Sequence, residues 1–432
     1  MPKRLPLILP ESLKMKLLAT PLVGGPWGAF RRWELHREYT ARREFYAAIA
    51  AAKGVCYREE EVIANIRLRM KHRGYSPSRR RQGQIHTFAF FPSIGWHRDL
   101  LPDLRVLGPV THFDYSALGF SPRDIYKGRQ SGTAQRKAMN DRILPALRQA
   151  HGRRPVDWIF VYASGLEISA EVLRRIAGEF GIPIVNMCLD DKQSWEGRWL
   201  GNHRSGQVDI APEVDLSWTS SRLACEWYLS VEGRPVYLPE GFDASKWRSA
   251  GGEQDIPVSF VGAAYGSRPR IVRYLRRNGV PIQVYGSGWR NAAWVDDPVD
   301  VVRRSLINLG IGGIGFSERI TNVKGRDFEI PAVGRGVYLT SFNSDLAQHF
   351  VIGREILCYN SRDEMLELIR YYSSRPDEAR EIACRGRVRC LADHRWLHRY
   401  LYICGVLGIL DGACEGREGS AEGVETTCMS QS

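Results

Sequence analysis

The chain has 432 residues, an apolar fraction of 44%, a charged fraction of 25% and a formal net charge of +13. This length exceeds the size at which a single hydrophobic core stops growing, so two domains are expected. No apolar run is long enough for a membrane span, and prolines and charges interrupt the N-terminus where a signal peptide needs an apolar run. We therefore expect a cytoplasmic protein. The nine cysteines lack the paired spacing of zinc sites.

The excess of positive charge lies near the N-terminus. Residues 1–83 contain 18 Lys and Arg against 7 Asp and Glu, whereas the rest contains 43 against 41. We expect residues 1–85 to form a basic, mostly helical extension that ends in a linker. Such a segment is suited to peripheral contact with an anionic membrane, and a solvated face packed on the body is the alternative. Nucleic acid is not an expected partner, because no stacking-aromatic or recognition-helix pattern accompanies the charge.

From residue 86 onward, short apolar runs alternate with helical patterns. In the first half, the expected strands are 86–91, 157–162, 182–188, 214–219 and 236–238, and the expected helices are 98–107, 167–180 and 222–231. Continuous apolar strands separated by helices are typical of a parallel sheet that is covered on both faces. The pattern predicts a Rossmann-like, doubly wound α/β domain over residues 86–245.

The alternation restarts after a stretch rich in Gly and Pro at 239–256, which predicts a second domain over residues 255–393. Its expected strands are 258–262, 282–285, 337–340 and 356–359, and its expected helices begin near residues 267, 301, 361 and 376. A helix within 394–410 follows, and the Gly-, Glu- and Ser-rich tail 411–432 is expected to be disordered. Two such domains would face a cleft, and ligands of these sheets bind beyond the carboxyl ends of the strands.

The stretch from Lys324 to Gly334, KGRDFEIPAVG, is the most informative motif. The side chains of Lys324 and Arg326 can bind phosphate oxygens, and the Glu329 carboxylate can accept hydrogen bonds from two adjacent hydroxyls, as on a ribose. A solvated basic helix face is the alternative interpretation. The motif predicts a pocket for a nucleotide sugar.

Other candidate residues stand where the expected strands end. Gly262 and Gly286 would let the backbone approach a ligand, and Arg268 stands at the first turn of a helix, where a guanidinium and backbone N–H groups can hold phosphate. Asp190 and Asp191 end a buried strand, so either could act as a general base on an acceptor hydroxyl, or could merely shape a turn. Glu240 is a similar candidate at the start of the linker. Two adjacent Asp without a third ligand do not indicate a metal site.

The order of these motifs resembles the CgeB-like (spore maturation protein type) glycosyltransferases, which belong to the group 1 glycosyl transferases of the GT-B fold. The matching pieces are FVG at 260–262, VYG at 284–286, KGRDFEIPA at 324–332, LDD at 189–191 and LPEGF at 238–242. The resemblance implies two Rossmann-like domains facing a central cleft, with the acceptor on the first and the donor mostly on the second. It also implies that the last helices cross back to the first domain.

The resemblance implies a metal-independent hexosyltransferase that moves a sugar from a nucleotide-diphosphate sugar to an acceptor hydroxyl, in surface glycan or glycoconjugate synthesis. No cofactor is expected, because the nucleotide sugar is a substrate. One departure concerns the pair of Glu seven residues apart in related retaining enzymes: Glu329 fits the second position, but Thr321 occupies the first. This departure keeps open the alternative of a degenerate GT-B scaffold anchored by its basic N-terminal segment. A nucleotide-sugar epimerase of the same fold is a second alternative, which a carboxylate-rich centre without an acceptor groove would favour.

Overall fold

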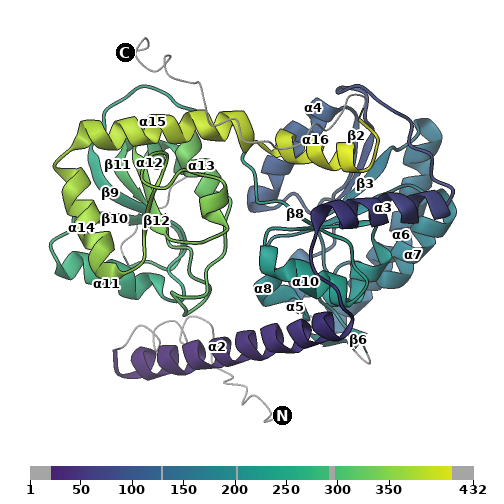
Figure 1. Cartoon of the computed structure of the whole chain (residues 1–432), viewed down its shortest axis with the longest axis horizontal. Helices are drawn as coiled ribbons and strands as arrows, with labels where there is room; N and C mark the ends of the chain where they lie inside the picture. Colours follow the sequence, from purple (N-terminus) through teal and green to yellow (C-terminus); the bar gives the residue numbers. More distant parts are fainter. Residues whose placement is uncertain (1–20, 128–129, 201–202, 291–296, 411–432) are drawn as a thin grey trace.

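The computed structural model describes residues 21–127, 130–200, 203–290 and 297–410. The predicted disordered tail, 411–432, lies outside these residues. Two parallel sheets stand side by side, each between layers of helices, and helix α2 (Pro21–Ala52) runs along one side of both (Figure 1). This is the two-sheet α/β arrangement that the alternating pattern predicts.

The first sheet has the strand order β2-β1-β3-β4-β7-β8, and every pairing in it is parallel. Its strands are β1 (Thr87–Phe90), β2 (Val110–Phe113), β3 (Trp158–Val161), β4 (Ile184–Cys188), β7 (Leu216–Thr219) and β8 (Pro235–Tyr237). The residues of β1, β3, β4 and β7 are all buried, as continuous apolar strands covered on both faces must be.

Helices from distant parts of the chain cover the two faces of this sheet. One face carries α3 (Glu59–His72), η1 (Gly95–Leu100), α4 (Leu101–Leu107) and α16 (Trp396–Val406), and the other carries α6 (Gln130–Arg153) and α7 (Ala170–Phe180). Shorter elements complete this half: α5 (Pro122–Lys127), α8 (Asp191–Ser194), β5 (Trp199–Leu200), β6 (His203–Arg204), α9 (Gln207–Ile210), η2 (Ala211–Glu213) and α10 (Arg222–Ser230).

The second sheet has the order β10-β9-β11-β12-β13 and is also parallel throughout. Its strands are β9 (Ile256–Val261), β10 (Ile282–Tyr285), β11 (Ser305–Leu309), β12 (Val337–Ser341) and β13 (Leu357–Tyr359). Helices α11 (Arg268–Arg277) and α14 (Arg362–Ser373) pack on one face, and α12 (Pro298–Arg304) and α13 (Arg326–Val333) pack on the other. Helix α15 (Pro376–Asp393) contributes residues to the cores on both sides. The short η3 (Leu346–Gln348) precedes β13.

Several elements were not expected from the sequence, among them two strands and one long helix. Strand β2 and helix α6 lie in the polar region between residues 108 and 156, where α6 shows little apolar periodicity and contains Pro145. Strand β11 follows directly on α12, so the helix expected from residue 301 ends at Arg304 and the next five residues belong to the middle of the sheet. A five-residue strand without a turn before it is hard to separate from the end of a helix by periodicity.

The chain connects the two halves at several places. After β8 it passes to β9, and after α15 it returns, so that α16 packs against α4 on the first half (Figure 1). A backbone bridge between Phe242 and Arg395 lies where these two crossings meet. None of the described helices combines the length and the low charge that a bilayer-spanning helix needs.

Candidate active site

The candidate active site lies between the two halves, where the loops after β4 meet the loop before α13. The Lys192 Nζ donates to the carbonyl oxygen of Thr321 at 2.8 Å, and the Asn322 Nδ2 donates to the carbonyl oxygen of Leu189 at 2.9 Å. The Lys324 ammonium forms an ion pair with the Asp190 carboxylate. These contacts hold the carboxyl ends of the two parallel sheets against each other, which is where ligands of doubly wound sheets bind.

The predicted motif at 324–334 forms the start of α13 and the turn before it. The buried Asp327 carboxylate accepts from the backbone N–H of Lys324 at 2.7 Å and from the Tyr338 hydroxyl at 2.5 Å. Asp327 therefore anchors this turn on strand β12. Gly334 ends the helix with a φ of 68°, a conformation that favours glycine. The turn before α13 thereby presents Lys324, and the first residue of the helix presents Arg326, toward the interior of the site.

Glu329 and Glu240 flank Gly325 at the centre of the site. A Cβ atom placed on Gly325 would lie 2.8 Å from Glu240 Oε2 and 3.5 Å from Glu329 Oε1, so a side chain at position 325 would collide with Glu240. Burial raises the pKa of Glu240 to about 8, against the effect of Lys324 and with further help from Asp190 and Glu329. Burial also raises the pKa of Glu329 to about 7, and Asp99 adds to the effect.

An unsatisfied set of hydrogen-bond donors lies beside these carboxyls. Ser267 Oγ, Arg268 Nε and Arg326 Nη1 are buried and have no hydrogen-bond partner within the described residues. The two guanidinium groups stand near the same Phe260 ring, at 5.5 and 5.9 Å from its centroid. Burial, with a smaller contribution from the neighbouring Arg326, lowers the pKa of Arg268 to about 10. Two neighbouring guanidinium groups that each keep a buried, unpartnered donor atom are suited to a diphosphate.

The glycines predicted for the site close one side of this donor set. Gly262 and Gly286 end β9 and β10 with φ values of 155° and 117°, and a Cβ on Gly286 would lie 2.8 Å from the Gly262 carbonyl oxygen. A Cβ on Gly262 would lie 3.4 Å from Arg268 Nη1. Both positions therefore need glycine for close packing, and Gly262 also leaves room at the Arg268 guanidinium.

The two adjacent aspartates face opposite ways. Asp190 borders the site and pairs with Lys324, whereas Asp191 is fully buried and accepts from the Thr219 hydroxyl at 2.5 Å and the Tyr228 hydroxyl at 2.7 Å. Burial raises the pKa of Asp191 to about 6. Asp191 thus joins the loop after β4 to β7 and α10, and the structure does not bring it together with the other site residues. The second carboxyl group that the first half contributes to the site is that of Glu240, which lies near Lys324 and Asp190.

A cavity of about 1250 Å³ lies next to Asp190, on the first half of the molecule. It opens beyond the carboxyl ends of β1, β3 and β4, and its walls include His97, Tyr162, Glu167 and Asp190. The His97 ring contacts Tyr162 with 5.1 Å between centroids, and burial lowers the pKa of this histidine. Helix α2 forms a further wall. The cavity offers aromatic, carboxylate and guanidinium groups to a polar ligand beside the donor set.

Some of these residues were visible in the sequence and others were not. Glu240 follows an apolar run, so its place at a strand end could be foreseen, whereas Ser267 carries no such signal. The wall that α2 forms depends on how a distant helix packs. Within the described ranges, no group of three His, Cys, Asp or Glu side chains is arranged to hold a metal ion.

The two Rossmann-like halves and the site between them define the GT-B fold. Solved structures of this fold are similar to the chain. The Anabaena protein HepE in complex with UDP-glucose matches with a TM-score of 0.51 and 11% identity over 74% of this chain and 99% of that chain. HepE in complex with UDP and glucose matches with a TM-score of 0.50, 10% identity and the same coverage. These matches confirm the predicted fold.

The second half also has a counterpart in sequence. Residues 268–405 match the family model described as "Glycosyl transferase-like". Sucrose-phosphate synthase from Thermosynechococcus elongatus is a further structural match, with 12% identity, a TM-score of 0.49 and coverage of 74% of this chain and 100% of that chain. A search of curated proteins finds no significant match. The family match thus begins at α11 and extends to α16, and it leaves the first sheet without a counterpart in sequence.

Proposed function

We propose that this protein is a glycosyltransferase that moves a sugar from a nucleotide-diphosphate sugar to an acceptor hydroxyl. The observation that supports this function best is the set of buried, unpartnered donors on Ser267, Arg268 and Arg326, next to a carboxylate and across from a cavity. The donors suit a diphosphate, and the Glu329 carboxylate suits the ribose hydroxyls. The family match of the second half and the UDP-glucose in the similar HepE structure agree with this assignment.

In the proposed reaction, the bond between the sugar and the diphosphate breaks as the acceptor oxygen bonds to the sugar. The guanidinium groups of Arg268 and Arg326 stabilise the charge on the leaving nucleotide. Asp190 takes the proton of the acceptor hydroxyl. The Asp190 carboxylate is paired with Lys324 in the structure, so a diphosphate that attracts the Lys324 ammonium would free this carboxylate to act as a base.

The finer assignments belong to the same proposal. We propose a hexosyltransferase of the CgeB-like type that needs no metal, since cationic side chains can take the charge of the leaving group, and that acts in surface polysaccharide or glycoconjugate synthesis. We place it in the cytoplasm, with peripheral contact to an anionic membrane through its basic residues 1–83. Of the alternatives, an epimerase would need no acceptor space, and the cavity of about 1250 Å³ beside Asp190 favours a transferase.

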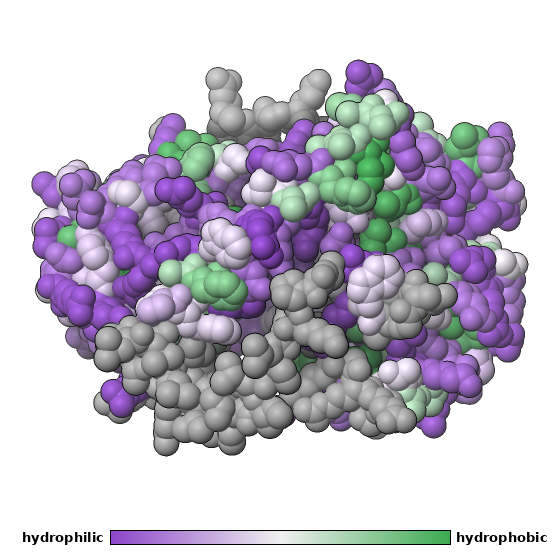
Figure 2. All heavy atoms as spheres, turned by 90° about the horizontal axis from the view of Figure 1, so that it is seen from below, coloured by the Kyte–Doolittle hydropathy of each residue, from purple (hydrophilic) through white to green (hydrophobic). Residues whose placement is uncertain are grey.

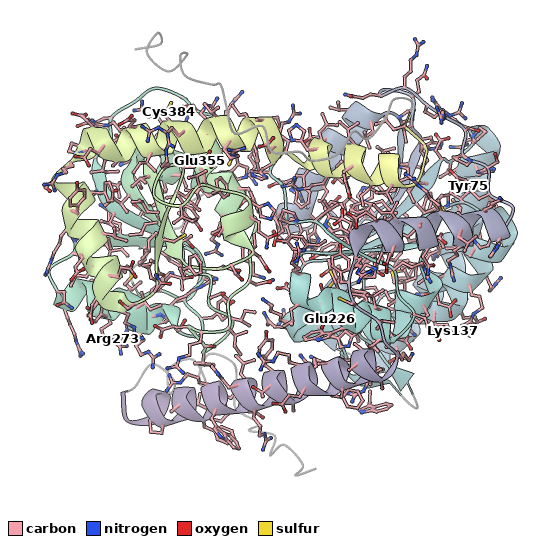
Figure 3. The ribbon with its side chains drawn as sticks, viewed as in Figure 1. Tyr75, Lys137, Glu226, Arg273, Glu355 and Cys384 are labelled. Atoms are coloured by element: carbon pink, nitrogen blue, oxygen red, sulfur yellow. The ribbon has the colours of Figure 1, made fainter. Side chains whose placement is uncertain are left out.

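The test is the thermal stability of the protein with UDP-, GDP-, dTDP- and CMP-sugars. A donor at about one hundred times its dissociation constant should stabilise the wild type by about 2.7 kcal/mol. We expect one nucleotide class to do so, and Glu329→Ala and Arg326→Gln to lose the shift. Arg273→Gln is the matched control, because Arg273 is exposed on the outer side of α11 (Figure 3).

Two further readouts complete this test. The shift should grow between pH 6 and pH 8, because Glu329 ionises near pH 7 and only its carboxylate accepts from both ribose hydroxyls. The shift should also survive the addition of EDTA. If no sugar nucleotide stabilises the wild type, the scaffold alternative is favoured and the donor assignment is wrong.

A further inference from the structure

The outer side of helix α2 carries a row of exposed aromatic side chains. The exposed fractions of Trp27, Phe30 and Trp33 are 37%, 51% and 55%. The rings of Trp27 and Phe30 are 6.2 Å apart and those of Phe30 and Trp33 are 6.1 Å apart, so the three form a continuous strip. We call these three residues the aromatic face of α2.

The opposite side of α2 holds the helix in place on both halves of the molecule. On the first half, Tyr46 is buried against Trp195 and Trp227, with ring centroids 5.6 and 6.0 Å apart. On the second half, His36 Nε2 and Ser317 Oγ are 2.8 Å apart. The helix therefore cannot rotate to bury its aromatic face, and side chains on its outer side point away from both sheets (Figure 3).

Arginine side chains accompany these aromatic rings. The Arg37 guanidinium lies 4.7 Å from the centroid of Trp33, and that of Arg31 lies 5.9 Å from the centroid of Trp27. Helix α2 has five Arg and three Glu, and residues 1–20, which precede it in the sequence, have four Lys and Arg against one Glu. Figure 2 views the molecule from the side of α2 and shows hydrophobic (green) and intermediate (white) residues among hydrophilic (purple) ones.

The hairpin of β5 and β6, close to one end of α2 (Figure 1), repeats the combination. The exposed fraction of Trp199 is 58%, and the Arg204 guanidinium lies 4.3 Å from its ring centroid. Exposed Trp and Phe together with Arg are found in helices that lie in the interface of an anionic bilayer. A contiguous strip of exposed aromatic side chains indicates a binding surface.

We propose that the aromatic face of α2 and the hairpin of β5 and β6 dock on the interfacial region of an anionic bilayer, which delivers the acceptor. Both elements line the cavity beside Asp190: α2 contributes Arg42 and Phe45, and the hairpin contributes Arg204. An acceptor anchored in the docked bilayer would reach this cavity without crossing the protein. The acceptor part of the proposal rests on the proposed glycosyltransferase function, whereas the docking does not.

The test is sedimentation of the full chain with vesicles of phosphatidylcholine, alone or with about a third phosphatidylglycerol. We expect the wild type to bind the anionic vesicles, and to bind more weakly as salt screens the arginines. The double variant Phe30→Ser, Trp33→Ser should bind at least about tenfold more weakly, because two exposed rings no longer enter the bilayer. Both side chains are exposed, so its melting temperature should stay close to that of the wild type.

Tyr371→Ser is the matched control. Tyr371 is also an exposed aromatic residue, with an exposed fraction of 44% and the Arg375 guanidinium 3.9 Å from its centroid, but it lies on α14 at the second half. This variant should bind vesicles like the wild type. Equal binding by the double variant and the wild type, or no binding by the wild type, would overturn the proposal. The donor shift is measured without vesicles, so a failure of docking and a failure of the proposed function give different results.

Discussion

At the scale of single residues, the site is a group of charges that the fold brings together against their own repulsion. Arg268 and Arg326 stand beside each other. Asp190 and Glu240 both lie near the Lys324 ammonium, and Glu329 lies near Glu240. Burial lowers the pKa of Lys324, but Asp190 and Glu240 outweigh that effect and leave it raised. Like charges held this close lower the stability of the free protein. A ligand that relieves their repulsion therefore gains binding free energy.

The burial of Glu240 predicts that the free energy of unfolding depends on pH, and that Glu240→Gln removes this dependence. Burial holds the Glu240 pKa near 8, above its ordinary value of 4.5, so between these pH values the folded state binds a proton that the unfolded state has lost. The Glu240 contribution therefore makes stability fall as the pH rises from 4.5 to 8. Glutamine mimics the protonated form, and we expect the variant to be more stable than the wild type by about 2 kcal/mol at pH 8 and nearly equal at pH 5.

Urea denaturation at a series of pH values measures this difference. Glu226→Gln, on α10 and outside the site (Figure 3), is the control, and its difference from the wild type should not grow with pH. If the stability advantage of Glu240→Gln is the same at pH 5 and pH 8, Glu240 is ionised in the folded protein and the interpretation of its burial is wrong.

At the scale of elements, local signals decide where helices begin and end. Ser361 was predicted to open a helix, and its Oγ accepts from the Glu364 backbone N–H at 3.1 Å at the start of α14. The Glu364 carboxylate reaches back one residue further than expected, to the backbone N–H of Asn360 at 2.6 Å. Side chains at this end of the helix therefore provide hydrogen-bond acceptors for backbone N–H groups that have no partner within the helix.

Loss of this cap should be measurable. We expect Ser361→Ala to destabilise the protein by about 1 kcal/mol, because the first turn of α14 loses a hydrogen-bond acceptor. Ser373→Ala, at the exposed last residue of the same helix, should stay within about 0.5 kcal/mol of the wild type. Calorimetry of both variants checks the prediction, and equal melting temperatures for the two would contradict it.

The sequence predicted some elements well and others not at all. Strands that are continuous apolar runs, such as β3 and β4, were predicted within about two residues, because burial on both faces requires such runs. The motif from Lys324 to Gly334 correctly indicated the end of the second sheet that borders the site. In contrast, the opposite directions of Asp190 and Asp191 follow from the hydroxyls of Thr219 and Tyr228, which are distant in sequence. Tertiary packing of this kind leaves no local signal.

At the scale of the whole molecule, α2 lies along both halves and contacts each through a different part of its length. Its C-terminal part is buried around Tyr46 and Ala50, whereas its N-terminal part meets the second half at Ser317, Phe316 and Gly315. The two ends of one helix are thus held with different strength. Any change in the angle between the halves must loosen the weaker contact first.

Hydrogen exchange can detect this difference. We expect amides of residues 43–52 to exchange more slowly than those of residues 25–34. His36→Ala removes the contact with Ser317 and should accelerate exchange around residues 28–40 about fivefold, without changing residues 43–52. Thr40→Ala, at an exposed position of the same helix, is the control. Uniform acceleration along all of α2 would show that the helix is released as one unit.

The return of the chain to the first half has a consequence for biosynthesis. Trp396, Tyr400 and Ile403 belong to the hydrophobic core that covers one face of the first sheet, although they are translated after the whole second sheet. During translation, the residues of the second half can therefore complete their core while the first half still lacks a helix. Although it is made first, the first half must finish folding last, and a chaperone that shields exposed apolar surface would find this face open until α16 emerges from the ribosome.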